Sequence, residues 1–188
     1  IKEAVFDFVR LSHYPQSPAF LDACDELGLV TINPILGWQY YNPDPEFSKY
    51  VFNAARSLIR RDRNHACVLA WELSLNESQM PESFVDSLLQ IREEEYPYED
   101  SYTAGWIPYG YNIYLQARQH RIGHANEFPD KPYLVSEYGD WEYYAMNAGL
   151  NQDQWSNLLP GERSSRQLIG ESDPYLLQQA LNVQEAHN

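Results

Sequence analysis

Short apolar runs alternate along the chain with segments of helical periodicity, and this alternation constrains the fold more than any other feature. The apolar runs predict strands at residues 4–10, 29–32, 66–71 and 131–139. Apolar side chains three or four positions apart predict helices at 18–28, 47–58 and 81–95, and another from 173 onward. Strands that alternate with helices form parallel sheets, so the chain is expected to have an α/β fold.

Two segments between these elements are less clearly patterned. Residues 100–106 are compatible with a strand, and residues 111–125 predict a helix preceded by at most a short strand. The predicted strands are apolar throughout, which is typical of a sheet that is buried on both faces. Polar and aromatic residues gather directly after the strands, where parallel α/β folds build their sites, in barrels and open sheets alike.

Composition narrows the classes of function. The 188 residues suit one domain, and the net charge of −14, from 27 acidic and 13 basic residues, argues against a nucleic-acid partner. No run of 18 apolar residues suggests a membrane span, and the N-terminus lacks a signal-peptide pattern. The aromatic content of 14% suits either a sugar-binding protein or a large core.

Cofactor and metal motifs are absent from the sequence. Neither GxGxxG nor GxxxxGK[ST] occurs, so the nucleotide-binding versions of the fold are disfavoured. Cys24 and Cys67 lie in apolar segments without metal-ligand spacing and are expected to be buried thiols. We therefore expect no cofactor and no metal ion.

Two glutamates, Glu77 and Glu137, each follow an apolar strand directly. Across the mouth of a barrel, two such strand ends can face each other. Cleavage of a glycosidic bond needs this pair, because one carboxyl group protonates the leaving oxygen and the other attacks the anomeric carbon or activates water. A chain with 27 acidic residues also places two after strands by chance, so the pair alone does not decide the function.

The residues around the pair are more specific. The segments "FVRLSHYPQSPAFLDACDELGL", "RRDRNHACVLAW", "LNES" and "KPYLVSEYGDWEYY" together resemble the catalytic barrel of glycoside hydrolase family 2, which includes β-galactosidases, β-glucuronidases and β-mannosidases. The likeness runs from about residue 3 to residue 144, with the motifs in the order of the family. It implies a (β/α)8 TIM barrel and a two-carboxylate mechanism that retains the anomeric configuration.

The resemblance also implies roles for individual residues. Glu77 corresponds to the general acid/base, Glu137 to the nucleophile, and Asn76 to the amide that holds the 2-hydroxyl of the sugar. Arg10 and His13 correspond to residues that line the pocket floor and support the carboxylates. Further candidates for substrate binding are Trp38 and Tyr138.

Several of these residues also have a structural interpretation. Arg10 could be the partner of a structural ion pair, His13 a core histidine, and Trp38 a packing residue. Trp71, in the middle of a predicted strand, is expected in the core. The basic run at residues 60–64 is expected to complement a helix C-terminus and acidic neighbours.

The sequence departs from the family pattern in three ways. "TINPILGW" has Asn33 and Pro34 where the family often carries acidic residues, so a magnesium site is not expected there. "WELSLNE" is one residue longer than the usual "WSLGNE", and a bulge before Asn76 could absorb the extra residue. The recognisable strands correspond to about strands two to seven, so residues 1–188 are expected to form a single partial barrel domain without the first and eighth strands.

The leading hypothesis is the core of a retaining exo-β-glycosidase of β-galactosidase type, acting on a carbohydrate substrate. The isolated chain is expected to be inactive without the missing strands and the β-sandwich domains of a longer protein. The alternatives are an inert barrel fragment or carbohydrate-binding relic, and β-mannosidase or β-glucuronidase specificity. The sequence specifies neither linkage, aglycone nor compartment, and a periplasmic or secreted location stays open.

Overall fold

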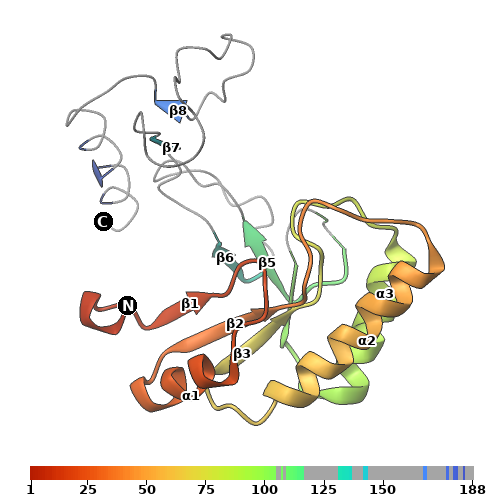
Figure 1. The fold of residues 1–188 in the computed structure, drawn as a ribbon, viewed down its shortest axis with the longest axis horizontal. Helices are drawn as coiled ribbons and strands as arrows, with labels where there is room; N and C mark the ends of the chain where they lie inside the picture. Colours follow the sequence, from red (N-terminus) through yellow and green to blue (C-terminus); the bar gives the residue numbers. More distant parts are fainter. Residues whose placement is uncertain are drawn as a thin grey trace. The chain divides into compact units, whose positions relative to one another are not determined.

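A computed structural model describes residues 1–104, 107, 109–116 and 131–136, and the positions 142–143, 167–168, 177, 180–181 and 184 (Figure 1). The chain divides into two compact units. The first comprises Ile1–Leu115 and Phe128–Leu134, and the second Gln116–Glu127 and Val135–Asn188. In the second unit, the described strands β7 (Glu142–Tyr143) and β8 (Gln167–Leu168) form a parallel pair. The helix expected from Asp173 lies mostly outside the described residues.

A six-stranded sheet organises the first unit. Its strands are β1 (Phe8–Arg10), β2 (Val30–Pro34), β3 (Val68–Glu72), β4 (Tyr102–Ala104), β5 (Ile113–Gln116) and β6 (Tyr133–Val135). They lie in the order of the sequence, and the pairings from β1 to β5 are parallel. Sequential parallel strands with intervening helices are the arrangement of a TIM barrel, so the predicted incomplete (β/α)8 barrel is confirmed.

Three helices connect the first four strands: α1 (Pro18–Leu27), α2 (Pro45–Asp62) and α3 (Glu82–Glu95). The hydroxyl of Ser17 accepts a hydrogen bond from the amide of Phe20 at the start of α1, and Gly28 ends this helix with a φ of 65°. Figure 1 shows α2 and α3 packed side by side. The local capping residues therefore set these boundaries within a few positions of those predicted.

One predicted strand is shorter than expected, and one loosely patterned segment is defined by the structure. The strand predicted over residues 4–10 is confined to β1, because Lys2–Ala4 form a short 3-10 helix (η1) and Val5 has a left-handed φ of 67°. The short strand allowed at the start of residues 111–125 is present as β5, and the helix expected after it, at 117–125, lies outside the described residues. Residues 105–112 join the parallel strands β4 and β5, although such crossovers usually need about a dozen residues or more.

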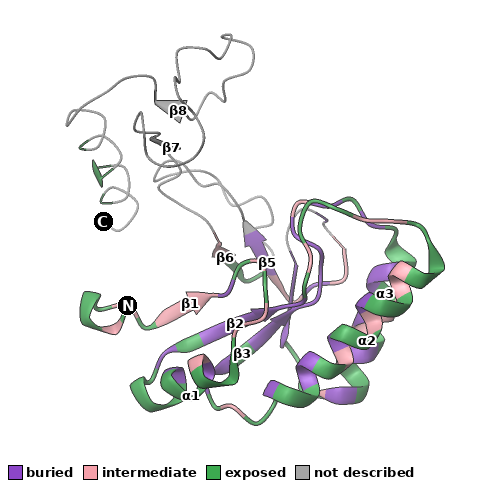
Figure 2. Cartoon of the chain, in the orientation of Figure 1, coloured by how far each residue is buried: buried purple, intermediate pink, exposed green. Residues whose placement is uncertain are grey.

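Two clusters of buried apolar side chains pack against the sheet. Figure 2 shows buried residues along β2 and β3 and on α2 and α3. Between the sheet and the helices lie Trp71, Cys24 and Cys67, all buried as predicted, within the larger core. On the other face, Ile32, Ala70 and Leu115 form a small fully buried cluster. They come from β2, β3 and β5, as expected for a layer of side chains that fills the interior of a barrel.

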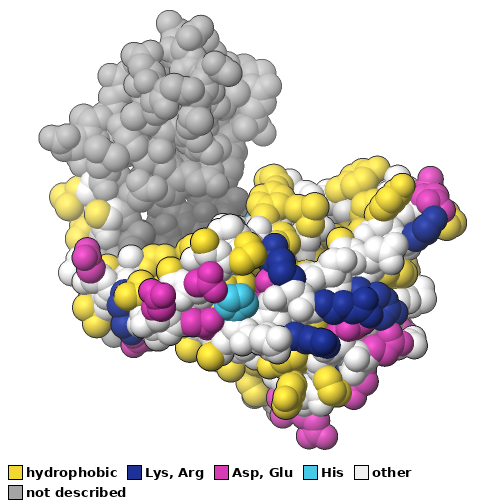
Figure 3. Space-filling model, turned by 60° about the horizontal axis from the view of Figure 1, so that its bottom comes forward, with side chains coloured by type: hydrophobic (Ala, Val, Ile, Leu, Met, Phe, Trp, Pro, Cys, Tyr) yellow, Lys and Arg dark blue, Asp and Glu magenta, His cyan; other side chains and the backbone are white. Residues whose placement is uncertain are grey.

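Ion pairs join α2 to α3. Arg60 binds Glu95 through two hydrogen bonds, Nε to Oε2 at 2.8 Å and Nη2 to Oε1 at 2.6 Å, and Arg56 and Arg63 approach the same carboxylate at 3.5 and 3.7 Å. The expectation that the basic run at 60–64 complements acidic neighbours is thereby confirmed. On the face shown in Figure 3, several basic side chains lie close together, with acidic side chains at their border.

These ion pairs predict a pH dependence of stability. Hydrogen bonds from Arg60 hold the pKa of Glu95 below its usual range, although burial alone would raise it. A carboxyl group whose pKa falls on folding stabilises the native state above its unfolded pKa, and this contribution disappears as the pH falls through the folded value. We expect Glu95→Gln to lower the free energy of unfolding at pH 7 more than at pH 3.

Urea unfolding of the chain and the variant at the two pH values measures this difference. Glu93→Gln, on an exposed carboxylate of the same helix, is the control and should show little pH dependence. An equal loss at both pH values would contradict the assignment.

No helix among the described residues is both long and apolar enough to cross a membrane.

Candidate active site

Five of the predicted site residues come together beyond the C-terminal ends of the first three strands. Arg10 is the last residue of β1 and His13 follows it, Trp38 follows β2, and Asn76 and Glu77 follow β3. The hydrogen bonds and ring contacts below connect all five. Glu137 and Tyr138 lie outside the described residues; β6 is the strand that precedes them.

A buried ion pair forms the floor of this cluster. Arg10 Nε donates to Oε2 of Glu72 at 2.9 Å, and Nη2 donates to Oε1 at 2.6 Å. The side chains of Arg10 and Glu72 are only 5% and 1% exposed. The structural ion pair considered for Arg10 is therefore present. Sequence reasoning missed Glu72, although an acidic residue inside the apolar run "VLAWEL" was a usable signal.

Asn76 is held by groups on two strands. Its Oδ1 accepts a hydrogen bond from Arg10 Nη2 at 3.0 Å, and its Nδ2 lies 3.5 Å from His13 Nε2. Burial, and then the positive charge of Arg10, lower the pKa of His13, against the opposing effect of Glu72 and Glu77. A neutral ring can accept a hydrogen bond from Asn76 at Nε2, which leaves the second Nδ2 hydrogen of the amide for a further partner.

Glu77 accepts two side-chain hydrogen bonds on one oxygen. Trp38 Nε1 donates to Oε2 at 2.9 Å, and Gln39 Nε2 donates to the same atom. The indole ring of Trp38 stacks parallel on the imidazole of His13 with centroids 5.8 Å apart. Gln39 was not predicted, and no pattern in the sequence distinguishes it.

The segments that carry these side chains run side by side. Trp38 forms a parallel bridge with Asn76, and the amide of Gln39 donates to the carbonyl of Asn76 at 2.9 Å. Gly37 has a φ of 143°, and a Cβ atom at this position would collide with Leu75. Glycine is therefore required for the close approach.

A shift of pairing lies in β3, ahead of the segment "WELSLNE". Thr31 pairs with Val68 and Ile32 with Ala70, which leaves Leu69 between two paired positions. Such a bulge changes the direction of a strand. This irregularity lies at Leu69, seven positions before Asn76, and so outside "WELSLNE", where the sequence suggested a bulge.

Among the described residues, one group has the composition of a metal site: Asp25, His65 and Cys67, whose ligand atoms lie within 4.8 Å of one another. Asp25 is already engaged, because Oδ1 accepts from the Cys67 amide and Oδ2 pairs with His65 Nδ1, each at 2.7 Å. Burial raises the pKa of the Cys67 thiol to about 12, whereas a metal ligand must be a thiolate. Through these hydrogen bonds Asp25 connects α1 to the residues that precede β3.

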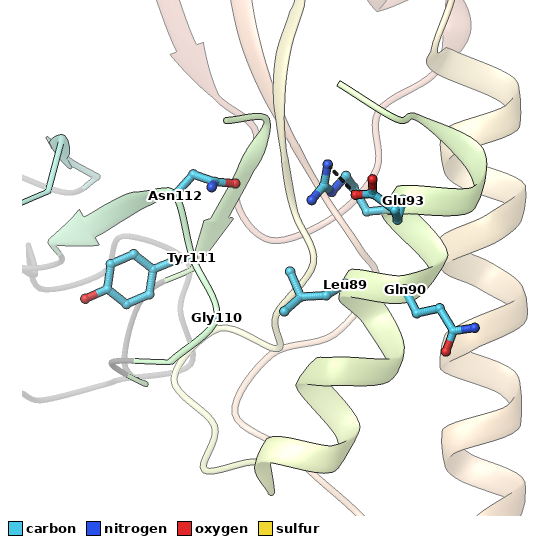
Figure 4. Close-up of a pocket in the computed structure, with 7 residues that line it drawn as sticks. Leu89, Gln90, Glu93, Gly110, Tyr111 and Asn112 are labelled. Atoms are coloured by element: carbon cyan, nitrogen blue, oxygen red, sulfur yellow. Dashed lines mark ion pairs between the residues drawn. The ribbon is translucent and has the colours of Figure 1, made fainter. Parts of the chain in front are cut away.

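A separate hollow of about 450 Å³ lies between α3 and residues 110–112 (Figure 4). Leu89 points toward Gly110 and Asn112, and the ion pair between Arg92 and Glu93 borders it. None of the predicted site residues lines this hollow.

Comparisons with known proteins agree with the barrel fold described above. Residues 1–159 match the family model described as "Glycosyl hydrolases family 2, TIM barrel domain". The fold, and the side chains gathered at the C-terminal ends of β1, β2 and β3, are those of a glycosidase barrel. The chain belongs to glycosyl hydrolase family 2. The predicted resemblance is confirmed.

Two curated relatives are β-galactosidases. The protein of Thermoanaerobacterium thermosulfurigenes is 36% identical over 173 residues, covering 84% of this chain and 24% of the relative. That of Thermoanaerobacter pseudethanolicus is 31% identical over 147 residues, covering 72% and 19%. The chain thus spans about a quarter or less of their length.

Solved structures support the fold. The apo structure of Bacteroides uniformis β-glucuronidase 3 superposes with a TM-score of 0.52 at 22% identity, covering 61% of this chain and 16% of that one. The Ruminococcus gnavus β-glucuronidase gives 0.51 at 19% identity, covering 61% and 23%. At these identities the likeness concerns the barrel alone.

Proposed function

We propose that this chain forms the catalytic core of a retaining exo-β-glycosidase of β-galactosidase type. The observation that carries the proposal is the placement of Glu77: its carboxylate is held at the mouth by Trp38 and Gln39, next to the anchored amide of Asn76. The names of the two curated relatives support galactose as the sugar.

In the proposed mechanism, Glu77 is the general acid/base and Glu137 the nucleophile. Glu137 attacks the anomeric carbon while Glu77 gives its proton to the glycosidic oxygen, and the aglycone leaves. Glu77 then takes a proton from water, which attacks the same carbon and releases Glu137. Two inversions give net retention, and they require the carboxyl groups to lie about 5–5.5 Å apart.

The buried residues below the mouth have a supporting role in this proposal. Arg10 and His13 hold Asn76, whose remaining Nδ2 hydrogen can donate to the 2-hydroxyl of the sugar. A hydrogen bond at this hydroxyl strengthens in the transition state and contributes several kcal/mol. The ion pair between Arg10 and Glu72 would therefore act on catalysis through the orientation of Asn76.

The stereochemical course tests the proposal. We expect a longer protein that contains this chain to hydrolyse 4-nitrophenyl β-galactoside and to release the β-anomer first, followed by proton NMR before mutarotation. β-Glucuronide and β-mannoside substrates serve as matched controls for the sugar. Release of the α-anomer first would indicate inversion, and binding without hydrolysis would favour the carbohydrate-binding alternative.

The assignment of all 188 residues to one partial catalytic domain stays part of the proposal. The missing strands would supply further walls of the pocket, so we propose that the isolated chain is inactive.

A further inference from the structure

The loop after β2 contacts the proposed acid/base with two successive residues. Trp38 and Gln39 lie beside Asn76 and Glu77 because the parallel pairing of β2 with β3 resumes beyond the strand ends. Both side chains direct an N–H group at Oε2 of Glu77. Two donors from one segment therefore fix this carboxylate.

Two hydrogen bonds on one oxygen make the two oxygens of Glu77 inequivalent. The two N–H donors engage both lone pairs of Oε2, so the proton of the acid form belongs on the other oxygen, Oε1. The stacking of Trp38 on His13 limits rotation of the indole and so fixes the direction of its N–H group. The loop thereby specifies which oxygen faces the substrate.

We propose that Trp38 and Gln39 are positioning residues that present Oε1 of Glu77 to the glycosidic oxygen; the inference rests on the proposed function. In the first step, the O–H bond at Oε1 breaks and its proton joins the glycosidic oxygen. The bond from the anomeric carbon to that oxygen breaks, and its electron pair leaves with the aglycone. The negative charge that develops on Glu77 is stabilised by the two donors on Oε2, which act most strongly when the charge has formed.

If Trp38 and Gln39 position Glu77 for proton transfer, their loss should affect substrates differently according to the leaving group. A purely structural role would affect all substrates alike. A good leaving group such as 2,4-dinitrophenolate departs without a proton, whereas an alkoxide needs one. General acid catalysis contributes about 10²- to 10⁴-fold, and a misplacement of about 1 Å costs on the order of 10²-fold. Loss of the two donors should therefore slow substrates with poor leaving groups selectively.

The experiment uses Gln39→Met and Trp38→Phe, which remove the donors but keep much of the volume, in a longer protein that contains this chain. We expect kcat/KM for methyl β-galactoside to fall about 10- to 100-fold, and kcat/KM for 2,4-dinitrophenyl β-galactoside to stay within about twofold. With the activated substrate, the second step should slow, because Glu77 then takes the proton from water less readily. The covalent intermediate accumulates, so kcat and KM should fall together. Tyr40→Phe, on an exposed ring of the same loop, should change neither substrate.

An equal fall on both substrates, or no fall on either, would overturn the inference. If the unsubstituted protein hydrolyses no glycoside, the proposed function fails instead. A crystal structure of the double variant decides the positioning independently of activity. We expect the Glu77 carboxylate to rotate away from its position in the unsubstituted protein, and an unchanged position would refute the role of the two donors.

Discussion

Replacing Glu137 by alanine is expected to abolish hydrolysis of every β-glycoside by a longer protein that contains this chain. The proposed nucleophile forms the covalent intermediate, so no substrate bypasses it. Loss of such a group lowers kcat on the order of 10⁴-fold or more. Glu93→Ala, on the exposed part of α3, is the control for a lost carboxylate and should keep full activity. Initial rates on 4-nitrophenyl β-galactoside measure the effect.

Glu77→Ala should behave differently, because the acid/base assists two steps but makes no bond to carbon. We expect this variant to retain the first step on substrates with good leaving groups and to be partly rescued by azide, which attacks the intermediate and gives a β-glycosyl azide. If azide instead rescued Glu137→Ala to that β-product, the two roles would have to be exchanged.

The second large effect concerns stability. Arg10→Met leaves Glu72 buried without its guanidinium partner, and removal of one member of a buried ion pair typically costs about 3–5 kcal/mol. We expect a loss of this size in the free energy of urea unfolding, together with weaker binding of the sugar because Asn76 loses its donor.

Two variants provide the comparison. Lys2→Met breaks an exposed pair with Asp7, which should contribute less than about 1 kcal/mol. The double variant of Arg10→Met and Glu72→Met removes both charges and should be less destabilised than Arg10→Met alone. A cost of Arg10→Met below that of Lys2→Met would show that Glu72 does not depend on Arg10 for its burial.

The sequence predicted the elements whose signals are local. Apolar runs located β2 and β3 within a few residues, and helical spacing located α1, which the structure caps with Ser17 and Gly28. The position of Glu77 at a strand end followed from the same reasoning. The prediction of the barrel required the family motifs, since alternating strands and helices also occur in open sheets.

The features that were missed depend on contacts distant in the sequence. Glu72 stands out in the sequence as an acidic residue in an apolar run, but its partner Arg10, 62 positions away along the chain, is known only from the pairing of β1 in the sheet. Gln39 contributes through a donor that reaches Glu77 across the loop, and nothing in "GWQYY" sets it apart from the neighbouring polar residues.

The backbone of Glu77 itself has a consequence for the evolution of such a protein. Its φ of 52° lies in the left-handed region, which glutamate adopts only at a cost of about 1–2 kcal/mol, whereas glycine and asparagine tolerate it. Selection for thermal stability alone would therefore favour replacing the very residue that we assign to proton transfer. The protein thus carries backbone strain at the residue that we assign to proton transfer, a cost in stability at the position of turnover.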